Sequence, residues 1–396
     1  MEYDVVVIGG GPSGASAATK LAQLGRKVAL IDRFSRSKPC GGAIPPRLIQ
    51  DFNIPDSQLV AKITTARMIS PTGRKVDIPI ENGFVGMVDR ADFDPFLRTR
   101  AKNAGADVIV GSFLRLERSQ DDGVDVVFTD RSSQENKTIR TKYVIGADGA
   151  RSQVAHKEIE RSDELTYVIA YHEIIERPTS EHQTNYDPSR CDVIYDGRIS
   201  PDFYGWVFPH GESASVGMGT GHSKFDLKKA TAALRQDSGL DSCVTLRKEG
   251  APIPLKPLAK WDNGRDVLLS GDAAGVVAPS SGEGIYYAMM AGDLSANIVN
   301  KALKTSDASW LRTARKEFLK EHGQVFKVLG MMQNAYYRND TRRERFVSLC
   351  HDVDVQKLTF EAYMNKKLVH ARPMAHIKIG LKNMAHLMGL VSPVST

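Results

Sequence analysis

The N-terminal third of the chain opens with two short apolar runs separated by a helical pattern. Residues 3–8 are rich in Val, as are strands of a parallel sheet that is covered on both faces. Residues 12–24 carry small and apolar side chains at helical spacing, and residues 27–32 form a second apolar run. This order predicts a βαβ unit.

Strand patterns and glycine turns continue along the rest of the chain. Residues 139–152 and 265–275 each predict a buried strand that ends in a glycine turn. Between residues 166 and 221 polar and apolar positions alternate, which is typical of antiparallel strands with one covered face. Residues 282–303 predict a long helix, and the sequence from residue 308 onward is helical. The pattern therefore predicts an α/β fold with an antiparallel sheet and a C-terminal helical region.

Composition narrows the class of protein. The 396 residues are 41% hydrophobic and 25% charged, which is ordinary globular usage. The four cysteines are scattered without a CxxC pair, and the ten histidines show no metal-binding spacing, so we expect no disulfide framework and no metal. No apolar, uncharged stretch of spanning length and no signal peptide is present, and we expect a cytoplasmic protein.

The positive net charge of +6 comes from the C-terminal quarter of the chain. Residues 297–396 hold 17 Lys and Arg against 8 Asp and Glu, whereas the rest holds 36 against 39. Residues 376–391 place several apolar side chains near one helical face: Ile377, Leu381, Met384, Leu387 and Met388. Such a basic amphipathic helix can lie on a membrane surface, and an ordinary docking helix explains the pattern equally well. Peripheral membrane association is therefore one of two interpretations, and no nucleic-acid partner is expected.

The motif "GGGPSG" follows the first strand directly. It places Gly9, Gly11 and Gly14 in GxGxxG register, for a tight turn, close approach to a pyrophosphate and close helix packing. Asp32, at the end of the second predicted strand, can accept hydrogen bonds from ribose hydroxyls. Together these residues predict a dinucleotide site.

Two later turns favour FAD over NAD as the dinucleotide. "ADGARS" contains Asp148, and "GDAAG" contains Gly271 and Asp272. With GxGxxG in this order, they resemble FAD-dependent oxidoreductases of the aromatic-hydroxylase type. That resemblance gives Asp272 a contact with the ribityl or pyrophosphate part of FAD. In "VDRADFDPFL" it places Arg90 along the cofactor, where a helix-surface ion pair is the alternative interpretation.

A narrower resemblance covers nearly the whole chain. "PCGGAIP", "YGWVFP", "SGEGIYYAMMAG" and the tail "RRERFVSLCHDVDVQKLTFEAYMNKKL" are similar to geranylgeranyl reductases, most of all the branch of chlorophyll and bacteriochlorophyll synthesis. The resemblance implies reduction of isolated double bonds to a phytyl group, on geranylgeranyl diphosphate or on geranylgeranyl (bacterio)chlorophyll. It implies FAD as cofactor and NADPH as transient donor, with ferredoxin as the alternative. The implied cofactor contacts are Gly9, Gly11, Ser13, Gly14, Asp32, Arg33, Cys40, Gly41, Gly42, Arg90, Leu114, Asp148, Gly271, Asp272, Gly284 and Ile285.

Two features bear on the substrate and the chemistry. Tyr204, Trp206 and Phe208 alternate along a predicted strand and so share one face, where they line a polyprenyl site or form plain core. Cys40 is placed beside the flavin by the resemblance, as a small buried hydrophobe followed by two glycines or as a proton donor to the alkene. Cys40 is our one candidate catalytic residue.

The predicted organisation has three parts. Residues 1–60, 85–160 and 260–305 form a discontinuous Rossmann-type FAD-binding domain, residues 61–84 and 161–259 an antiparallel-sheet substrate domain, and residues 306–396 the helical C-terminal region. Three alternatives stay open: a flavin-dependent aromatic hydroxylase, a prenyl-lipid reductase outside photosynthesis, and a prenyl-binding escort protein without reductase activity.

Overall fold

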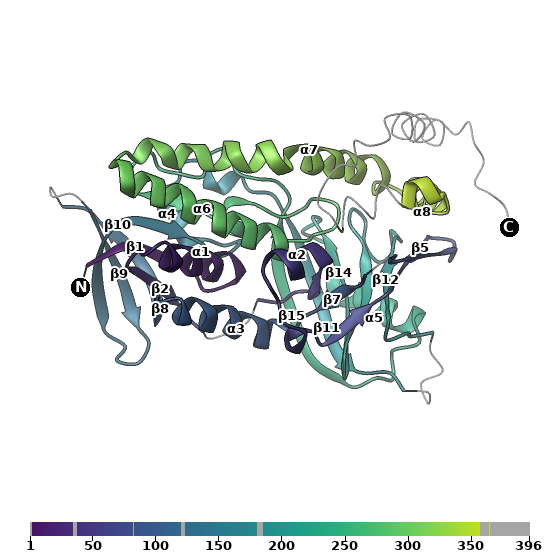
Figure 1. The fold of residues 1–396 in the computed structure, drawn as a ribbon. Coiled ribbons are helices and arrows are strands. Elements are labelled where there is room, and N and C mark those ends of the chain that lie inside the picture. Colours follow the sequence, from purple (N-terminus) through teal and green to yellow (C-terminus); the bar gives the residue numbers. More distant parts are fainter. Residues whose placement is uncertain are drawn as a thin grey trace. The chain divides into compact units, whose positions relative to one another are not determined.

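The computed structural model describes residues 2–34, 38–81, 83–119, 123–179, 185–356 and 364 (Figure 1). The chain forms two compact units, each built from three segments. Unit 1 comprises Met1–Lys38, Arg90–Tyr167 and Pro252–Gly323, and unit 2 comprises Pro39–Asp89, Val168–Ala251 and Gln324–Thr396. The first segment of unit 1 thus ends at Lys38, whereas the sequence interpretation grouped residues 39–60 with it. The amphipathic segment 376–391 lies outside the described residues.

Unit 1 is built on a six-stranded sheet. Its strands are β1 (Glu2–Ile8), β2 (Val28–Asp32), β8 (Asp107–Glu117), β9 (Val124–Asp130), β10 (Asn136–Gly146) and β16 (Val267–Leu269). β1 pairs in parallel with β2 and β10, and β10 with β16, which confirms the predicted βαβ start. Because carboxyl ends of parallel strands share one edge of a sheet, the turns after β1, β2, β10 and β16 gather there.

Helices cover this sheet. Unit 1 contains α1 (Pro12–Gln23), α3 (Arg90–Asn103), α4 (Gln153–Glu158), α6 (Ile285–Thr305) and the first part of α7 (Thr313–Tyr336), with the short helices η2 (Ser162–Glu164), η4 (Gly271–Ala274) and η5 (Ala308–Arg312). α1 and α6 lie side by side (Figure 1). Gly292 allows this approach, since a Cβ there would lie 2.2 Å from the Ser13 carbonyl oxygen.

Unit 2 holds a seven-stranded and a three-stranded sheet. The larger has the order β15 (Thr245–Pro254), β11 (Tyr167–Glu176), β14 (Ser213–Thr220), β13 (Gly205–His210), β12 (Arg190–Ile194), β5 (Thr65–Ile69) and β6 (Lys75–Pro79). The smaller has the order β3 (Ala43–Ile44), β7 (Val85–Met87) and β4 (Ala61–Ile63). Antiparallel pairing of β11, β14, β13 and β12 confirms the alternating pattern as one sheet.

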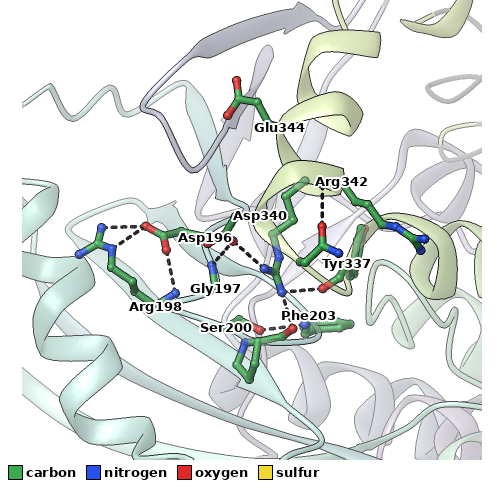
Figure 2. Close-up of polar contacts among 12 residues, drawn as sticks. Asp196, Gly197, Arg198, Ser200, Phe203, Tyr337, Asp340, Arg342 and Glu344 are labelled. Atoms are coloured by element: carbon green, nitrogen blue, oxygen red, sulfur yellow. Dashed lines mark hydrogen bonds and ion pairs between the residues drawn. The ribbon is translucent and has the colours of Figure 1, made fainter. Parts of the chain in front are cut away.

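The remaining helices of unit 2 are η1 (Asp56–Gln58), α2 (Pro46–Asp51), α5 (Leu227–Asp237), the second part of α7 and α8 (Asp340–Leu349). Arg343 of α8 is 2% exposed and donates to the Asp340 carboxylate and to the Pro201 and Tyr337 carbonyls. Figure 2 shows Asp340 and Tyr337 in this group, with Asp340 accepting the Gly197 N–H at 2.9 Å. These bonds fasten α8 to the loop between β12 and β13. Within the described part of the chain, no helix is both long and apolar enough to cross a bilayer.

Candidate functional site

The turn between β1 and α1 uses its glycines in two ways. Gly9 has a φ of +102°, and a Cβ there would lie 2.3 Å from the Ala147 carbonyl oxygen. A Cβ at Gly14 would lie 1.8 Å from the Gly9 carbonyl oxygen. Both glycines are therefore required by the packing of the turn itself. At Gly11 the nearest atom to a Cβ would be Arg90 Nη2, at 3.7 Å, so the chain alone does not require glycine there.

The open side of Gly11 is suited to a phosphate. Gly11 is the N-cap of α1 and supplies no side chain to cap it. The first N–H groups of a helix have no intrahelical acceptor and carry the positive end of the helix dipole. A pyrophosphate beside Gly11 would accept these groups. The residues present therefore fit the dinucleotide that the sequence predicted, and Gly11 has a reason to lack a side chain.

Asp32 ends β2 and binds the neighbouring backbone. One carboxylate oxygen accepts the Gly10 N–H and the other accepts the Phe34 N–H at 2.8 Å. The side chain is therefore held beside the glycine turn, and each oxygen retains a lone pair for a further donor. Arg33, the next residue, is exposed. Cofactor contacts of Asp32 and Arg33 stay predictions.

Arg90, at the start of α3, is buried and forms a bidentate pair with Asp94. Nε lies 2.6 Å from Oδ1 and Nη2 lies 2.8 Å from Oδ2. The pair fixes the guanidinium facing Gly11. The alternative interpretation, an ion pair on the helix surface, is wrong about exposure because both side chains are less than 10% exposed. A cofactor role for Arg90 stays a prediction.

The late turn after β16 packs against the start of α1. Ser13 Oγ donates to Ser270 Oγ at 2.8 Å, and a Cβ at Gly271 would lie 2.7 Å from Ser13 Cβ. The Asp272 carboxylate pairs with the Lys38 ammonium group. The structure therefore brings Gly11, Ser13, Gly271 and Asp272 together at one edge of the sheet.

Helix α6 begins close to that edge. Gly284 is its N-cap, and Ile285 is its first residue, as the sequence predicted. A Cβ at Gly284 would lie 3.3 Å from Val277 Cγ2 and 3.5 Å from Asp272 Oδ1, which is near ordinary contact. The amino end of α6, where the first N–H groups of a helix have no acceptor within the helix, therefore lies beside Asp272.

Two predicted contacts have local roles. Asp148 accepts Ser152 Oγ–H and the N–H groups of Gln153 and Val154, at 2.7 and 3.2 Å for the latter two. These bonds cap α4, and burial raises the pKa of Asp148. Leu114 lies half-buried in β8, where the pairing with β9 shifts register. The structure gives Asp148 a role that involves no ligand, and the cofactor contacts of both residues stay predictions.

The loop around Cys40 belongs to unit 2 and packs against β13. A Cβ at Gly41 would lie 3.3 Å from the Phe208 ring. Gly42 has a φ of +75°, and a Cβ there would lie 2.4 Å from the Val88 carbonyl oxygen and 2.6 Å from His210 Nε2. The space beside both glycines is therefore filled by the chain's own atoms.

Cys40 differs from the other cysteines. Its Sγ accepts the Gly42 N–H at 3.4 Å, and the residue is half-buried. Cys191, Cys243 and Cys350 are buried, and burial raises the pKa of each thiol, to about 12 for Cys350. Cys40 is therefore the most accessible of the four thiols.

Tyr204, Trp206 and Phe208 form one continuous aromatic strip in unit 2. The ring centroids are 6.0 Å apart for Tyr204 and Trp206 and 6.2 Å apart for Trp206 and Phe208. Tyr204 packs on the cluster of Tyr195 and Tyr337, while Phe208 packs on an apolar cluster that contains Met87, Ile63 and Met364. The shared face predicted for the three rings is confirmed, and a substrate role stays a prediction.

His210 extends the strip and was missed by sequence reasoning. Nδ1 lies 3.2 Å from the Phe208 carbonyl oxygen, which can only accept, so Nδ1 carries the proton. Burial lowers the pKa of His210 to about 4, against a smaller opposing effect of the Phe208 carbonyl. The two-residue period that groups Trp206 with Phe208 also includes His210, and this signal could have found it.

Comparisons with known proteins now identify the family. The FAD binding domain family matches residues 2–43 and 56–181. The geranylgeranyl diphosphate reductase of Rhodobacter capsulatus is 62% identical over 393 residues, 99% of either chain. The chain belongs to the geranylgeranyl diphosphate reductase family of FAD-dependent oxidoreductases.

Further members of this family are more distant. The Synechocystis enzyme is 36% identical and the Arabidopsis thaliana chloroplast enzyme 38% identical, covering 98% and 97% of this chain and 98% and 85% of their own. A solved geranylgeranyl bacteriochlorophyll reductase-like protein from Thermoplasma acidophilum has a TM-score of 0.80 at 23% identity, over 94% of this chain and 99% of its own. That likeness confirms the predicted fold class.

Proposed function

We propose that this member of the geranylgeranyl diphosphate reductase family reduces isolated double bonds of a geranylgeranyl group to phytyl, in (bacterio)chlorophyll synthesis. The observation that carries the proposal is 62% identity along the full chain to the Rhodobacter capsulatus enzyme of that name. The open space beside Gly11, at the amino end of α1, supports FAD as the resident cofactor. The aromatic strip of unit 2 supports a long apolar substrate.

The chemistry makes specific demands on the chain. An isolated alkene has no carbonyl to polarise it, so saturation requires a hydride on one carbon and a proton on the other. When bound and reduced, FAD supplies the hydride. The amino end of α6, with Gly284 as its N-cap, offers a positive dipole end to an anionic ring. The strip of Tyr204, Trp206 and Phe208 excludes water and orients the polyprenyl chain.

The Cys40 thiol is our candidate for the proton donor. Its accessibility, compared with the three buried cysteines, supports this role. The alternative is that Cys40 only fits the narrow loop between Pro39 and Gly41.

NADPH is the proposed donor of electrons, with ferredoxin as the alternative. Peripheral membrane association through residues 376–391 belongs to the same proposal. Over the described ranges, no group of three His, Cys, Asp or Glu could hold a metal ion.

Mass spectrometry of the products tests the function. The FAD-loaded protein is reduced and offered geranylgeranyl diphosphate and geranylgeranyl bacteriochlorophyll separately. We expect three successive additions of two hydrogens to at least one of them. No gain of hydrogen with either substrate on fully reduced protein would contradict the proposal. Cys40→Ser is the second arm: unchanged reduction of all three double bonds excludes an essential thiol, and a partly reduced product indicates a positioning role.

A second function has support from a specific relative. The digeranylgeranylglycerophospholipid reductase of Methanocaldococcus jannaschii is 32% identical over 80% of this chain and 81% of its own. The second candidate function is therefore reduction of a prenyl lipid outside photosynthesis, and that phospholipid is a third substrate in the same experiment.

An aromatic hydroxylase is a further alternative, because such enzymes share the fold. The p-nitrophenol 4-monooxygenase from Pseudomonas putida has a TM-score of 0.69 at 16% identity, over 92% of this chain and 98% of its own. Coupled consumption of NADPH and oxygen with a phenol would favour it.

A further inference from the structure

A buried chain of polar side chains lies behind Trp206. The indole Nε1–H donates to Ser215 Oγ at 3.0 Å, and the same oxygen lies 2.8 Å from His172 Nδ1. Trp206, Ser215 and His172 are 5%, 0% and 3% exposed. The Glu249 carboxylate lies 3.2 Å from His172 Nε2. Four strands of one sheet in unit 2, namely β11, β13, β14 and β15, each contribute one of these residues.

Gly217 makes the arrangement possible. It is paired with Trp206 on one side and with His172 on the other. A Cβ at Gly217 would lie 2.4 Å from His172 Cβ and 2.6 Å from Trp206 Cζ2. The absence of a side chain therefore lets the indole and the imidazole approach each other across β14, with ring centroids 6.2 Å apart.

The direction of the first hydrogen bond in this chain is fixed by its chemistry. The indole N–H can only donate, so Ser215 Oγ accepts it. Ser215 Oγ and His172 Nδ1 share the next hydrogen bond, whose direction follows the tautomer of the imidazole. Among the described residues His172 Nε2 makes no hydrogen bond, and it lies 3.2 Å from the Glu249 carboxylate, so the two groups are close without hydrogen-bond geometry. The orientation of the indole is therefore linked to Glu249 through Ser215 and His172.

We propose that Glu249, His172 and Ser215 are positioning residues that hold the Trp206 indole in one rotation and so determine how completely the polyprenyl chain is reduced. The proposal rests on the proposed function, because Trp206 is taken to contact the substrate. A buried hydrogen-bond network fixes a single geometry more tightly than apolar packing does. Trp206 lies between Tyr204 and Phe208, so a rotated indole would break the continuity of the strip.

A double-mutant cycle tests the coupling. We expect Ser215→Ala to slow full reduction about tenfold and to release partly reduced products, with KM changed less than about threefold, since misplacement mainly affects the reacting geometry. In a Trp206→Phe background the indole N–H is gone, so adding Ser215→Ala should leave the product distribution within about twofold. Additive effects in the cycle would overturn the proposal.

Matched variants separate positioning from stability. Ser70 is a buried hydroxyl of unit 2 that bonds Thr72 and Arg74, and Ser70→Ala should leave the product distribution unchanged. His172→Gln keeps an acceptor and a donor and should retain the wild-type products, whereas His172→Leu should behave like Ser215→Ala. Equal product shifts in Ser70→Ala, or in both His172 variants, would show that lost stability is the cause and would overturn the proposal.

A substrate-free readout distinguishes this proposal from the proposed function. The fluorescence of Trp206 is taken as the difference between the protein and its Trp206→Phe variant. We expect the anisotropy of this component to fall in Ser215→Ala and His172→Leu and to stay unchanged in His172→Gln and Ser70→Ala. An unchanged anisotropy in Ser215→Ala would refute the positioning role. Failure of the wild-type protein to reduce any prenyl substrate would instead count against the proposed function.

Discussion

The glycine turn of unit 1 and the Cys40 loop of unit 2 look alike in sequence and differ in structure. Each is a short stretch of glycines that the sequence interpretation assigned to the cofactor. At Gly11 the chain leaves room for a side chain that is not there. At Gly41 and Gly42 that room is taken by Phe208, Val88 and His210. A glycine with open space beside it leaves room for a ligand, whereas a glycine whose space the chain fills does not.

The difference changes what Cys40 can be expected to do. Gly41 and Gly42 hold the loop against β13, so Cys40 is positioned by the strand that carries Trp206 and Phe208. Its relation to the aromatic strip is therefore a property of unit 2 by itself. The resemblance also implied that Cys40 lies beside the flavin. The contacts of the loop within unit 2 do not bear on that prediction, which needs its own test.

Gly42→Ala should have the largest effect on the stability of unit 2. The positive φ and the overlap with the Val88 carbonyl oxygen together should cost unit 2 about 4 kcal/mol or more. Hydrogen exchange of the β13 and β14 amides measures this loss of stability. The control is Gly73→Ala, with a φ of +83° and no atom within 4 Å, where we expect about 1 kcal/mol from backbone strain alone. A Gly42→Ala protein that keeps its stability and loses FAD would show that Gly42 makes room for the cofactor. That result would contradict the distinction between the two loops.

We predict that His210 makes unit 2 sensitive to acid. Its pKa is lowered to about 4 in the folded chain, so the unfolded chain, with its ordinary pKa of about 6.5, binds the proton first as the pH falls. The stabilising contribution is complete above pH 6.5 and is lost between about 6.5 and 4. The full difference is about 3 kcal/mol.

Hydrogen exchange of unit 2 across that range checks this prediction. We expect the loss between pH 6.5 and 4 to be much smaller in His210→Gln. His156→Gln, which replaces an exposed histidine on α4, is the control and should follow the wild type. Parallel pH curves for the wild type and His210→Gln would show that His210 is protonated equally in both states.

Local patterns were enough to predict much of the fold. The βαβ start, the antiparallel sheet and the start of α6 at Ile285 follow from apolar periodicity and glycine position, and the structure has all three. Periodicity also placed Tyr204, Trp206 and Phe208 on one face. These features depend on neighbours along the chain, which a sequence displays directly.

Tertiary neighbours could not be predicted in the same way. The atoms that fill the space beside Gly42 come from residues 88 and 210, far away in sequence. Trp206 bonds Ser215, which bonds His172, which lies beside Glu249, and these three residues are on three other strands. Asp148 looks like a ligand contact in the sequence, yet its carboxylate caps α4. The first two cases need the sheet order, which periodicity does not contain, whereas the partners of Asp148 are local, at Ser152 to Val154.

Gly11→Ala should have the smallest effect on stability and a selective effect on binding. The nearest atom to its Cβ is 3.7 Å away, so we expect the free energy of unfolding to change by less than about 0.5 kcal/mol. The methyl group would occupy the place of a pyrophosphate, and the dissociation constant of FAD should rise at least about tenfold, or about 1.4 kcal/mol. Titration of the apoprotein with FAD, followed by flavin fluorescence, measures it. The contrasting variant is Gly9→Ala, two residues earlier, which should unfold unit 1 because of the 2.3 Å overlap with Ala147. Wild-type FAD affinity in a folded Gly11→Ala protein would mean that the open space beside Gly11 is not where the cofactor lies.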